Sequence, residues 1–201
     1  MTIQSLRLAL GRPVEYRRSF FRNLARLAVF LFGVEVATGA LLALYYRPDP
    51  EGAYASVGTL TSQVTLGWLA RGVHHVAGHA LAAVAGLYLV RAFFLRTFLR
   101  PKGTAGWVLA AAFALLTLAF LLTGLSLPWD QEAYWRTEMT TRIVEQVPFA
   151  GRWAASFFRG GSEVGAGTLT RLFALHALVF PWLGFGLILL ARRLRREGAM
   201  K

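Results

Sequence analysis

The chain has 201 residues, of which 56% are hydrophobic and 13% aromatic, and its formal net charge is +12. The apolar residues gather in four runs, near 23–46, 73–97, 107–127 and 170–190, each close to the ~20 residues that cross the hydrocarbon core of a bilayer. This pattern excludes an ordinary soluble domain. It predicts an all-α transmembrane four-helix bundle, with residues 1–201 forming one membrane-embedded domain. The sequence contains no cysteine, which excludes disulfides, thiolate ligands and covalently attached haem.

Basic residues mark one side of the predicted bundle. Fifteen of the 22 lysines and arginines lie in residues 1–26, around 91–102 and after residue 191, whereas the two other connections hold seven basic and seven acidic residues. Because cytoplasmic loops are enriched in lysine and arginine, we expect both termini in the cytoplasm, in a bacterial-type energy-transducing membrane. The other side is called the outer side below. This distribution of charge argues against nucleic acid as a partner.

The segments outside the four runs also have recognisable patterns. Residues 1–22 are basic and aromatic, which is typical of an amphipathic helix lying on the cytoplasmic leaflet. The connection of about 40 residues before the fourth run is too long for a structureless loop, and it predicts two short surface helices near 134–146 and 152–158. Within the first span, Glu35 places a carboxylate inside the membrane, which costs free energy. Such a residue either has a function or only makes a buried polar contact, and the polar contact is the more frequent explanation.

Two histidines are predicted at matched depth in the membrane. His74 lies a few residues inside the second span and His176 a few residues inside the fourth, and both spans begin on the outer side. Two neutral imidazoles in such positions can bind a haem iron from its two faces. The alternative is a pair of histidines that only pack or form hydrogen bonds inside the bundle.

Small residues and one arginine favour the haem interpretation. Gly39 and Gly124, in the first and third spans, fall in the same outer layer as the two histidines, where a missing side chain lets a flat macrocycle approach the backbone. Ala25 and Ala110 precede them by 14 residues, or about 21 Å along a helix. Arg71, three residues before His74, is placed to meet a haem propionate.

With these motifs the chain resembles the cytochrome b/b6 family. The resemblance is to the short four-helix form, from complexes in which the b cytochrome is divided into two separate chains. The resemblance covers nearly the whole chain and is carried by Val36-Ala37-Thr38-Gly39, Tyr45-Tyr46-Arg47-Pro48, Gly67-Trp68-Leu69-Ala70-Arg71-Gly72-Val73-His74, Thr123-Gly124-Leu125-Ser126-Leu127-Pro128-Trp129-Asp130-Gln131 and Thr168-Leu169-Thr170-Arg171. It implies two stacked b haems in the bundle and quinol oxidation near the outer one. The implied partners are a C-terminal, subunit IV-like cytochrome b half, a Rieske-type iron–sulfur protein and a c-type cytochrome, in a homodimeric complex.

The sequence departs from the family pattern in the inner layer. The second histidines of the family correspond here to Tyr88 and to Leu190 or Ala191, and its usual inner glycines correspond to Ala25 and Ala110. We therefore expect a single outer haem b, with His74 and His176 as iron ligands and with Arg71, Gly39 and Gly124 beside it.

The sequence also suggests roles for three other residues. His75 and His79 share a helix face that points away from His74. They could bind a metal or relay protons, but hydrogen bonding to a partner subunit is the favoured interpretation. Arg136 stands where the family has a small residue lining the quinol pocket, so a narrowed or more positively charged pocket is expected, which argues against ordinary quinol oxidation.

The sequence thus predicts an electron-transfer subunit of a quinol-oxidising complex that is not a complete enzyme alone. In the alternative, the chain is a membrane anchor or relay subunit, whose haem is structural or links an external redox protein to the quinone pool.

Overall fold

A computed structural model of the chain describes residues 13–99 and 103–199, and the regular structure of these residues is entirely helical. Four helical segments are long and apolar enough to span a membrane. They are α2 (Pro13–Ala43), α4 (Gly67–Phe94), α5 (Gly103–Ser126) and a fourth span made of α8 (Ala166–Phe173), the π-helical turn η2 (Ala174–Val179) and α9 (Phe180–Ala199). The predicted all-α, four-span fold is confirmed.

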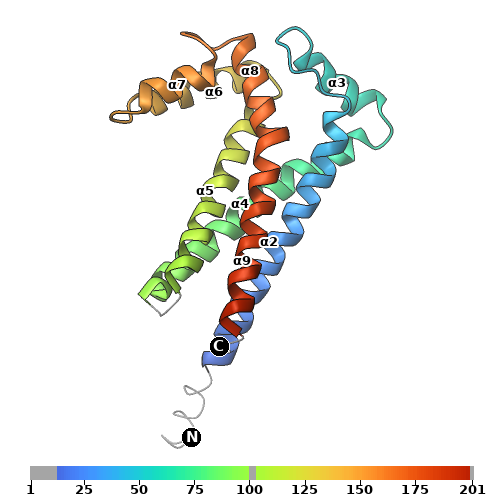
Figure 1. Cartoon of the computed structure of the whole chain (residues 1–201). Coiled ribbons are helices and arrows are strands. Elements are labelled where there is room, and N and C mark those ends of the chain that lie inside the picture. Colours follow the sequence, from blue (N-terminus) through green and yellow to red (C-terminus); the bar gives the residue numbers. More distant parts are fainter. Residues whose placement is uncertain (1–12, 100–102, 200–201) are drawn as a thin grey trace, which may run out of the picture.

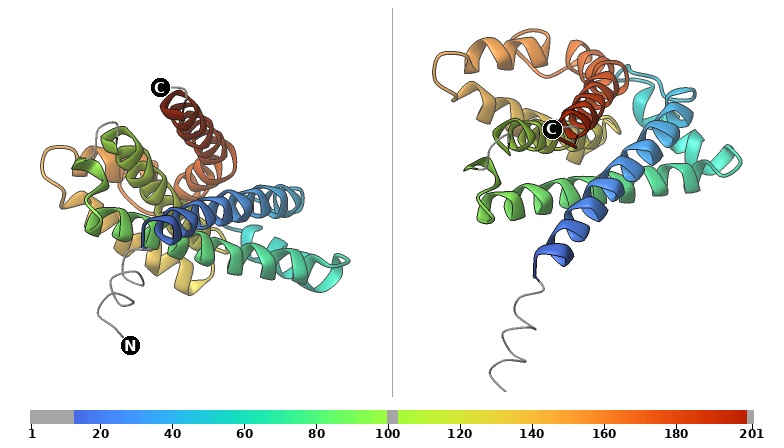
Figure 2. Two further views of the ribbon diagram at one scale, coloured as in Figure 1. Left: turned by 90° about the horizontal axis from the view of Figure 1, so that it is seen from below. Right: turned by 60° about the horizontal axis from the view of Figure 1, so that its bottom comes forward.

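The four spans form an up-and-down bundle. Helix α2 packs along α4, α4 packs against α5, and α5 packs against α9. The start of α2 and the end of α9 lie at one end of the bundle, and the short helices lie at the other (Figure 1). Views along and across the bundle show α4 crossing behind α2, with α9 on the opposite side of α2 (Figure 2). Spans two and four therefore run in the same direction, as expected.

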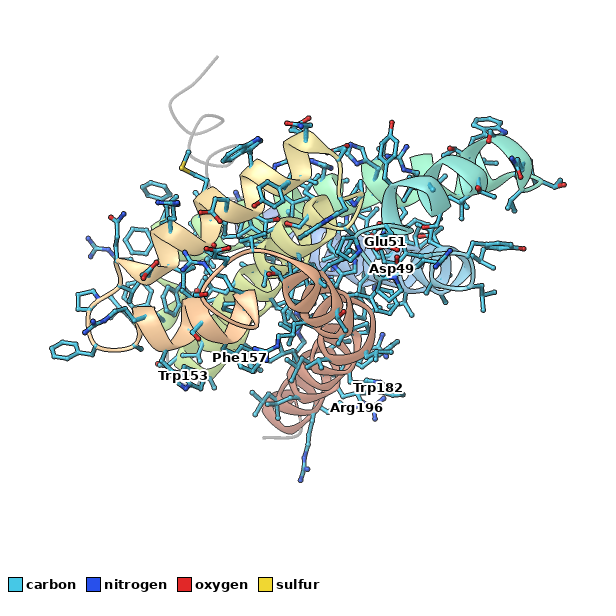
Figure 3. The ribbon with its side chains drawn as sticks, turned by 90° about the horizontal axis from the view of Figure 1, so that it is seen from above. Asp49, Glu51, Trp153, Phe157, Trp182 and Arg196 are labelled. Atoms are coloured by element: carbon cyan, nitrogen blue, oxygen red, sulfur yellow. The ribbon has the colours of Figure 1, made fainter. Side chains whose placement is uncertain are left out.

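Two short helices cover the outer end, as the sequence predicted. Helix α6 (Gln131–Glu145) begins at Asp130, whose carboxylate accepts a hydrogen bond of 2.8 Å from the Ala133 N–H. Helix α7 (Gly151–Arg159) is joined to α6 by the buried Arg159, which donates to Thr141 Oγ1 and Glu145 Oε2, both at 3.0 Å. Seen from above, Trp153 and Phe157 lie along one edge of α7 (Figure 3), with stacked rings 5.8 Å apart.

Some elements differ from the sequence prediction. Helix α3 (Ala53–Gln63) occupies the first outer connection, where no helix was predicted, and η1 (Thr97–Leu99) adds a 3-10 turn after α4. The glycine, serines and threonines of α3 give it a weak apolar pattern. The expected interfacial helix over 1–22 lies outside the described residues up to residue 12, and from Pro13 the chain is helical and continuous with the first span.

The outer ends of three spans are tied together by Tyr46. Its hydroxyl donates a 2.7 Å hydrogen bond to the Leu127 carbonyl at the end of α5, and its ring packs 5.3 Å from Phe173 at the end of α8. Nearby, the Thr170 hydroxyl donates to the Pro48 carbonyl at 3.3 Å. These contacts fix the first, third and fourth spans at the same height.

Phe32 is the centre of the apolar packing between the spans. Its side chain is only 2% exposed, and its ring meets those of Phe113, Phe120 and Phe185 edge to face, with centroids 6.1, 6.3 and 5.2 Å away. A Cβ atom on Gly184 would lie 2.5 Å from this ring. A glycine is therefore required where α9 passes Phe32.

We expect Gly184→Ala to destabilise the protein by about 1–3 kcal/mol, the usual cost of overpacking a tight core. The midpoint of thermal unfolding in detergent measures the effect. Gly186→Ala, on the same helix with no atom within 4 Å of the added Cβ, is the matched control and should not lower the midpoint. Equal midpoints for the two variants would contradict the packing described here.

Candidate functional site

His74 on α4 and His176 on η2 face each other at the outer end of the bundle. Their ring centroids are 6.2 Å apart and the ring planes are inclined by 72°. An imidazole–metal bond is about 2 Å long, so two imidazoles on opposite sides of one ion have ring centres roughly 6 Å apart. The spacing of this pair therefore fits two imidazole ligands that would hold one metal ion.

Each imidazole is oriented by a threonine of a neighbouring span. Thr38 Oγ1 lies 3.0 Å from His74 Nδ1, and Thr123 Oγ1 lies 3.0 Å from His176 Nδ1. Each threonine hydroxyl also donates its single hydrogen to a backbone carbonyl four residues earlier, at 2.7 Å. Its oxygen is then left to accept from the imidazole Nδ1–H. This network assigns the proton to Nδ1 in both rings and leaves each Nε2 able to bind a metal.

Gly39 and Gly124 make room for the histidine rings themselves. A Cβ atom on Gly39 would lie 3.1 Å from His74 Cε1, and one on Gly124 would lie 2.7 Å from His176 Cε1. The sequence prediction placed both glycines in the correct layer, although it gave close approach of a macrocycle as the reason. In the structure, the missing side chains also allow the two imidazoles to pack against the helix backbones.

The π-helical turn η2 carries His176 and was not predicted. Pro181 is the second residue of α9, two positions after the end of η2. A proline inside a helix removes one backbone hydrogen bond and its ring clashes with a carbonyl of the preceding turn, and a widened turn before it relieves that clash. Single π-helical turns are frequent at functional sites. Pro181 was the sequence signal for this irregularity.

Glu35, whose role the sequence left open, lies beside a candidate ligand. Its Oε2 atom is 3.2 Å from His74 Nδ1, and its side chain is 16% exposed. The carboxylate is therefore in direct polar contact with the His74 imidazole.

The remaining histidines and Arg71 lie on the surface of α4. Arg71 is exposed, one turn before His74. His75 and His79 are exposed as well, with ring centroids 4.6 Å apart, and His79 Nδ1 lies 2.8 Å from the His75 carbonyl oxygen. The structure does not test the predicted contact between Arg71 and a haem propionate. It also does not test the predicted roles of His75 and His79.

Arg136 is directed toward the backbone at the end of α5. Its guanidinium donates to the Leu125 carbonyl at 3.0 Å and pairs with Glu132. Carbonyls in the last turn of a helix have no partner within the helix, so Arg136 caps α5. Next to it, a pocket of about 310 Å³ opens on the surface, lined by Trp129, Asp130, Gln131, Tyr134 and Trp135.

The inner-layer positions that depart from the family pattern lie together in the structure. Ala25, Tyr88, Ala110 and Ala191 line one cavity of about 280 Å³. Its other described lining residues are Arg26, Ala28, Val29, Ala85, Gly106, Leu109, Phe113, Leu187, Ile188, Arg192 and Arg195. All four histidines of the chain lie outside this lining.

These features define a class of protein: a multi-pass membrane bundle with a bis-histidine site between two parallel spans. The comparisons agree with this class. The family model of cytochrome b/b6/petB matches residues 11–195, and the chain belongs to the cytochrome b/b6 family. Membership in this family implies haem b as a cofactor and a role in electron transport.

Cytochromes b6 are among the relatives of this chain. Cytochrome b6 of Prochlorococcus marinus is 36% identical over 165 residues, which is 82% of this chain and 75% of the relative. Cytochrome b6 of Synechococcus elongatus is 35% identical, over 82% of this chain and 76% of the relative. Among solved structures, a chain of a hyperthermophilic respiratory complex III shares the fold, with a TM-score of 0.79 and 23% identity. That likeness covers 98% of this chain and 55% of the solved chain.

We expect Gly124→Ala to displace the His176 ring, because the added Cβ would lie 2.7 Å from Cε1. The absorption spectrum of the purified protein should show a lower haem content. Gly106→Ala is a suitable control on the same helix, since its Cβ would have no atom within 4 Å. A Gly124→Ala protein with full haem content would show that this close contact does not position the ring.

Proposed function

We propose that the chain is the haem-binding electron-transfer subunit of a bc-type quinol-oxidising complex, with His74 and His176 as the iron ligands. The observation that carries this proposal is the facing pair of imidazoles 6.2 Å apart, each with its Nδ1 turned to a threonine oxygen. Family membership supports haem b as the bound group.

In this proposal the haem supplies the one-electron chemistry, and the protein supplies its binding site, its orientation and its electrostatic environment. Thr38 and Thr123 hold the imidazoles in the tautomer that leaves Nε2 for iron. Gly39 and Gly124 leave the rings the space they need, and the aromatic cluster around Phe32 packs against the site through Phe120, which contacts the His176 ring. Arg71, one turn from His74, is proposed as the partner of a propionate.

We further propose that only the outer haem is present. The inner cavity is lined by alanines, apolar side chains, Tyr88 and three arginines, and all four histidines lie elsewhere. Tyrosine can ligate haem iron in some proteins, but the position of the family's other inner histidine is held by Leu190 or Ala191, and neither side chain offers a ligand atom.

The complex implied by family membership contains further subunits. The chain spans about half the length of the solved complex III chain that it resembles. Among the partners we propose is a subunit IV-like protein that carries the C-terminal half of a cytochrome b. We also propose a Rieske-type iron–sulfur protein, a c-type cytochrome and quinone as partners, in a homodimeric assembly. The arginines near the end of α9 and the start of α2 support a cytoplasmic location for both termini.

A pyridine-haemochrome assay on the purified protein should give one haem b per chain. Protein concentration is measured independently by amino-acid analysis. A ratio of two haems per chain would contradict the single-haem proposal and leave the bis-histidine site intact.

His74→Ala and His176→Ala should each abolish the haem absorption spectrum, because one remaining imidazole cannot complete the axial pair. Tyr88→Phe, in the inner cavity, should leave the spectrum and the haem content unchanged. Loss of haem on Tyr88→Phe would instead indicate that the inner cavity binds it.

Reduction by a quinol distinguishes the proposed function from the alternative of an anchor or relay subunit. In the purified complex, we expect quinol to reduce the haem, as followed by its α-band absorbance. A haem that dithionite reduces, but that quinol neither reduces nor perturbs, would favour the alternative.

A further inference from the structure

The two candidate ligands have closely similar surroundings. His74 packs against Thr38 and Gly39 of α2, and His176 packs against Thr123 and Gly124 of α5. In each helix, the residue three positions before the threonine presents its backbone carbonyl to the imidazole: Glu35 in α2 and Phe120 in α5. The same framework therefore holds both rings.

The side chains at these two corresponding positions differ in chemistry. The Glu35 carboxylate approaches His74 with Oε2 at 3.2 Å from Nδ1. The Phe120 ring meets the His176 ring edge to face, with centroids 5.3 Å apart and planes inclined by 85°. One ligand thus has a carboxylate as a neighbour, whereas the other has an aromatic ring.

The carboxylate is enclosed by protein and is held near His74. The Oε1 atom of Glu35 is buried and accepts no hydrogen bond from the described residues. Gly78, one helical turn after His74 on α4, lies against the group, since a Cβ there would be in van der Waals contact with Oε2 at 3.4 Å. An ionisable side chain at membrane depth is costly unless it has a partner, and its polar partner here is the imidazole of His74.

Carboxylates that accept a hydrogen bond from a metal-bound histidine fix its orientation and raise its basicity. A more basic ligand donates more electron density to the metal and stabilises the oxidised, more positive state of iron. Hydrogen bonding and charge around the ligands are among the factors that set haem potentials. Glu35 has the position and chemistry to act in this way on one ligand alone.

Resting on the proposed function, we propose that Glu35 is a positioning residue for His74 that lowers the midpoint potential of the bound haem. Its Oε2 atom lies 3.2 Å from His74 Nδ1, the nitrogen that Thr38 also contacts, so a carboxylate stands beside the proton-bearing side of the ring. His176 has the threonine but no carboxylate, so the two axial ligands are electronically unequal. The competing explanation is that Glu35 only joins α2 to α4 through a buried polar contact.

A redox titration of the purified complex at one fixed alkaline pH, chosen so that the carboxylate is ionised, with mediators and dithionite, tests this proposal. Glu35→Gln keeps the size of the side chain and removes its negative charge. We expect the equilibrium between oxidised and reduced haem to shift at least tenfold toward the reduced form, which is a rise of about 59 mV for one electron. The g-values of the oxidised haem in electron paramagnetic resonance should also change.

Glu163→Gln is the control, because it removes the same charge from an exposed residue of the outer connection. Its potential should equal that of the unmodified protein. An unchanged or lower potential in Glu35→Gln would overturn the proposal and favour the purely structural contact.

A second variant covers the case in which Glu35→Gln fails to retain haem. Glu35→Asp keeps a carboxylate one methylene shorter. Haem retained by Glu35→Asp but lost by Glu35→Gln would support a requirement for the charge, whereas loss in both would assign Glu35 to packing. An unmodified protein without haem would defeat the proposed function itself, so the two failures are distinguishable.

Discussion

The rest of the structure depends on one constraint: the imidazole rings of His74 and His176 must face each other at the same depth in the bundle. Their rings lie 6.2 Å apart because two parallel spans bring them to the same depth and because a threonine–glycine pair of a neighbouring span orients each ring. The Tyr46 contacts fix the heights of three spans, and the π-helical turn η2 adjusts the fourth span around His176. Small changes in helix height would separate the imidazoles.

The outer and inner layers of the bundle have different chemistry and meet at a common group of aromatic rings. The outer layer holds the hydrogen-bonded imidazoles, while the inner layer holds a cavity with apolar walls and three arginines. Phe32 lies between them and contacts both Phe120, which touches His176, and Phe113, which lines the cavity. The layers are therefore separated by packed rings, with Gly184 providing the space that Phe32 requires.

The sequence predicted most of the fold because the length of apolar runs and the placement of arginine depend on the bilayer and not on tertiary detail. It also predicted that His74 and His176 share a layer with Gly39 and Gly124. The hydrogen bonds to the imidazoles could not be predicted, because they depend on how α2 rotates against α4 and α5 against the fourth span. The same holds for the contact of Glu35, and helix α3 was missed because its small polar residues carry little periodicity.

The order of the spans has a consequence for biogenesis. Synthesis proceeds from the N-terminus, and domains generally form in that order. Thr38, Gly39, Glu35 and His74 all belong to the first two spans, so half of the site is complete before the fourth span is made. His176 arrives last, on the irregular turn before Pro181. In the proposed function, capture of haem between His74 and His176 is thus a late event in assembly, and it joins the last span to a hairpin that is already in the membrane.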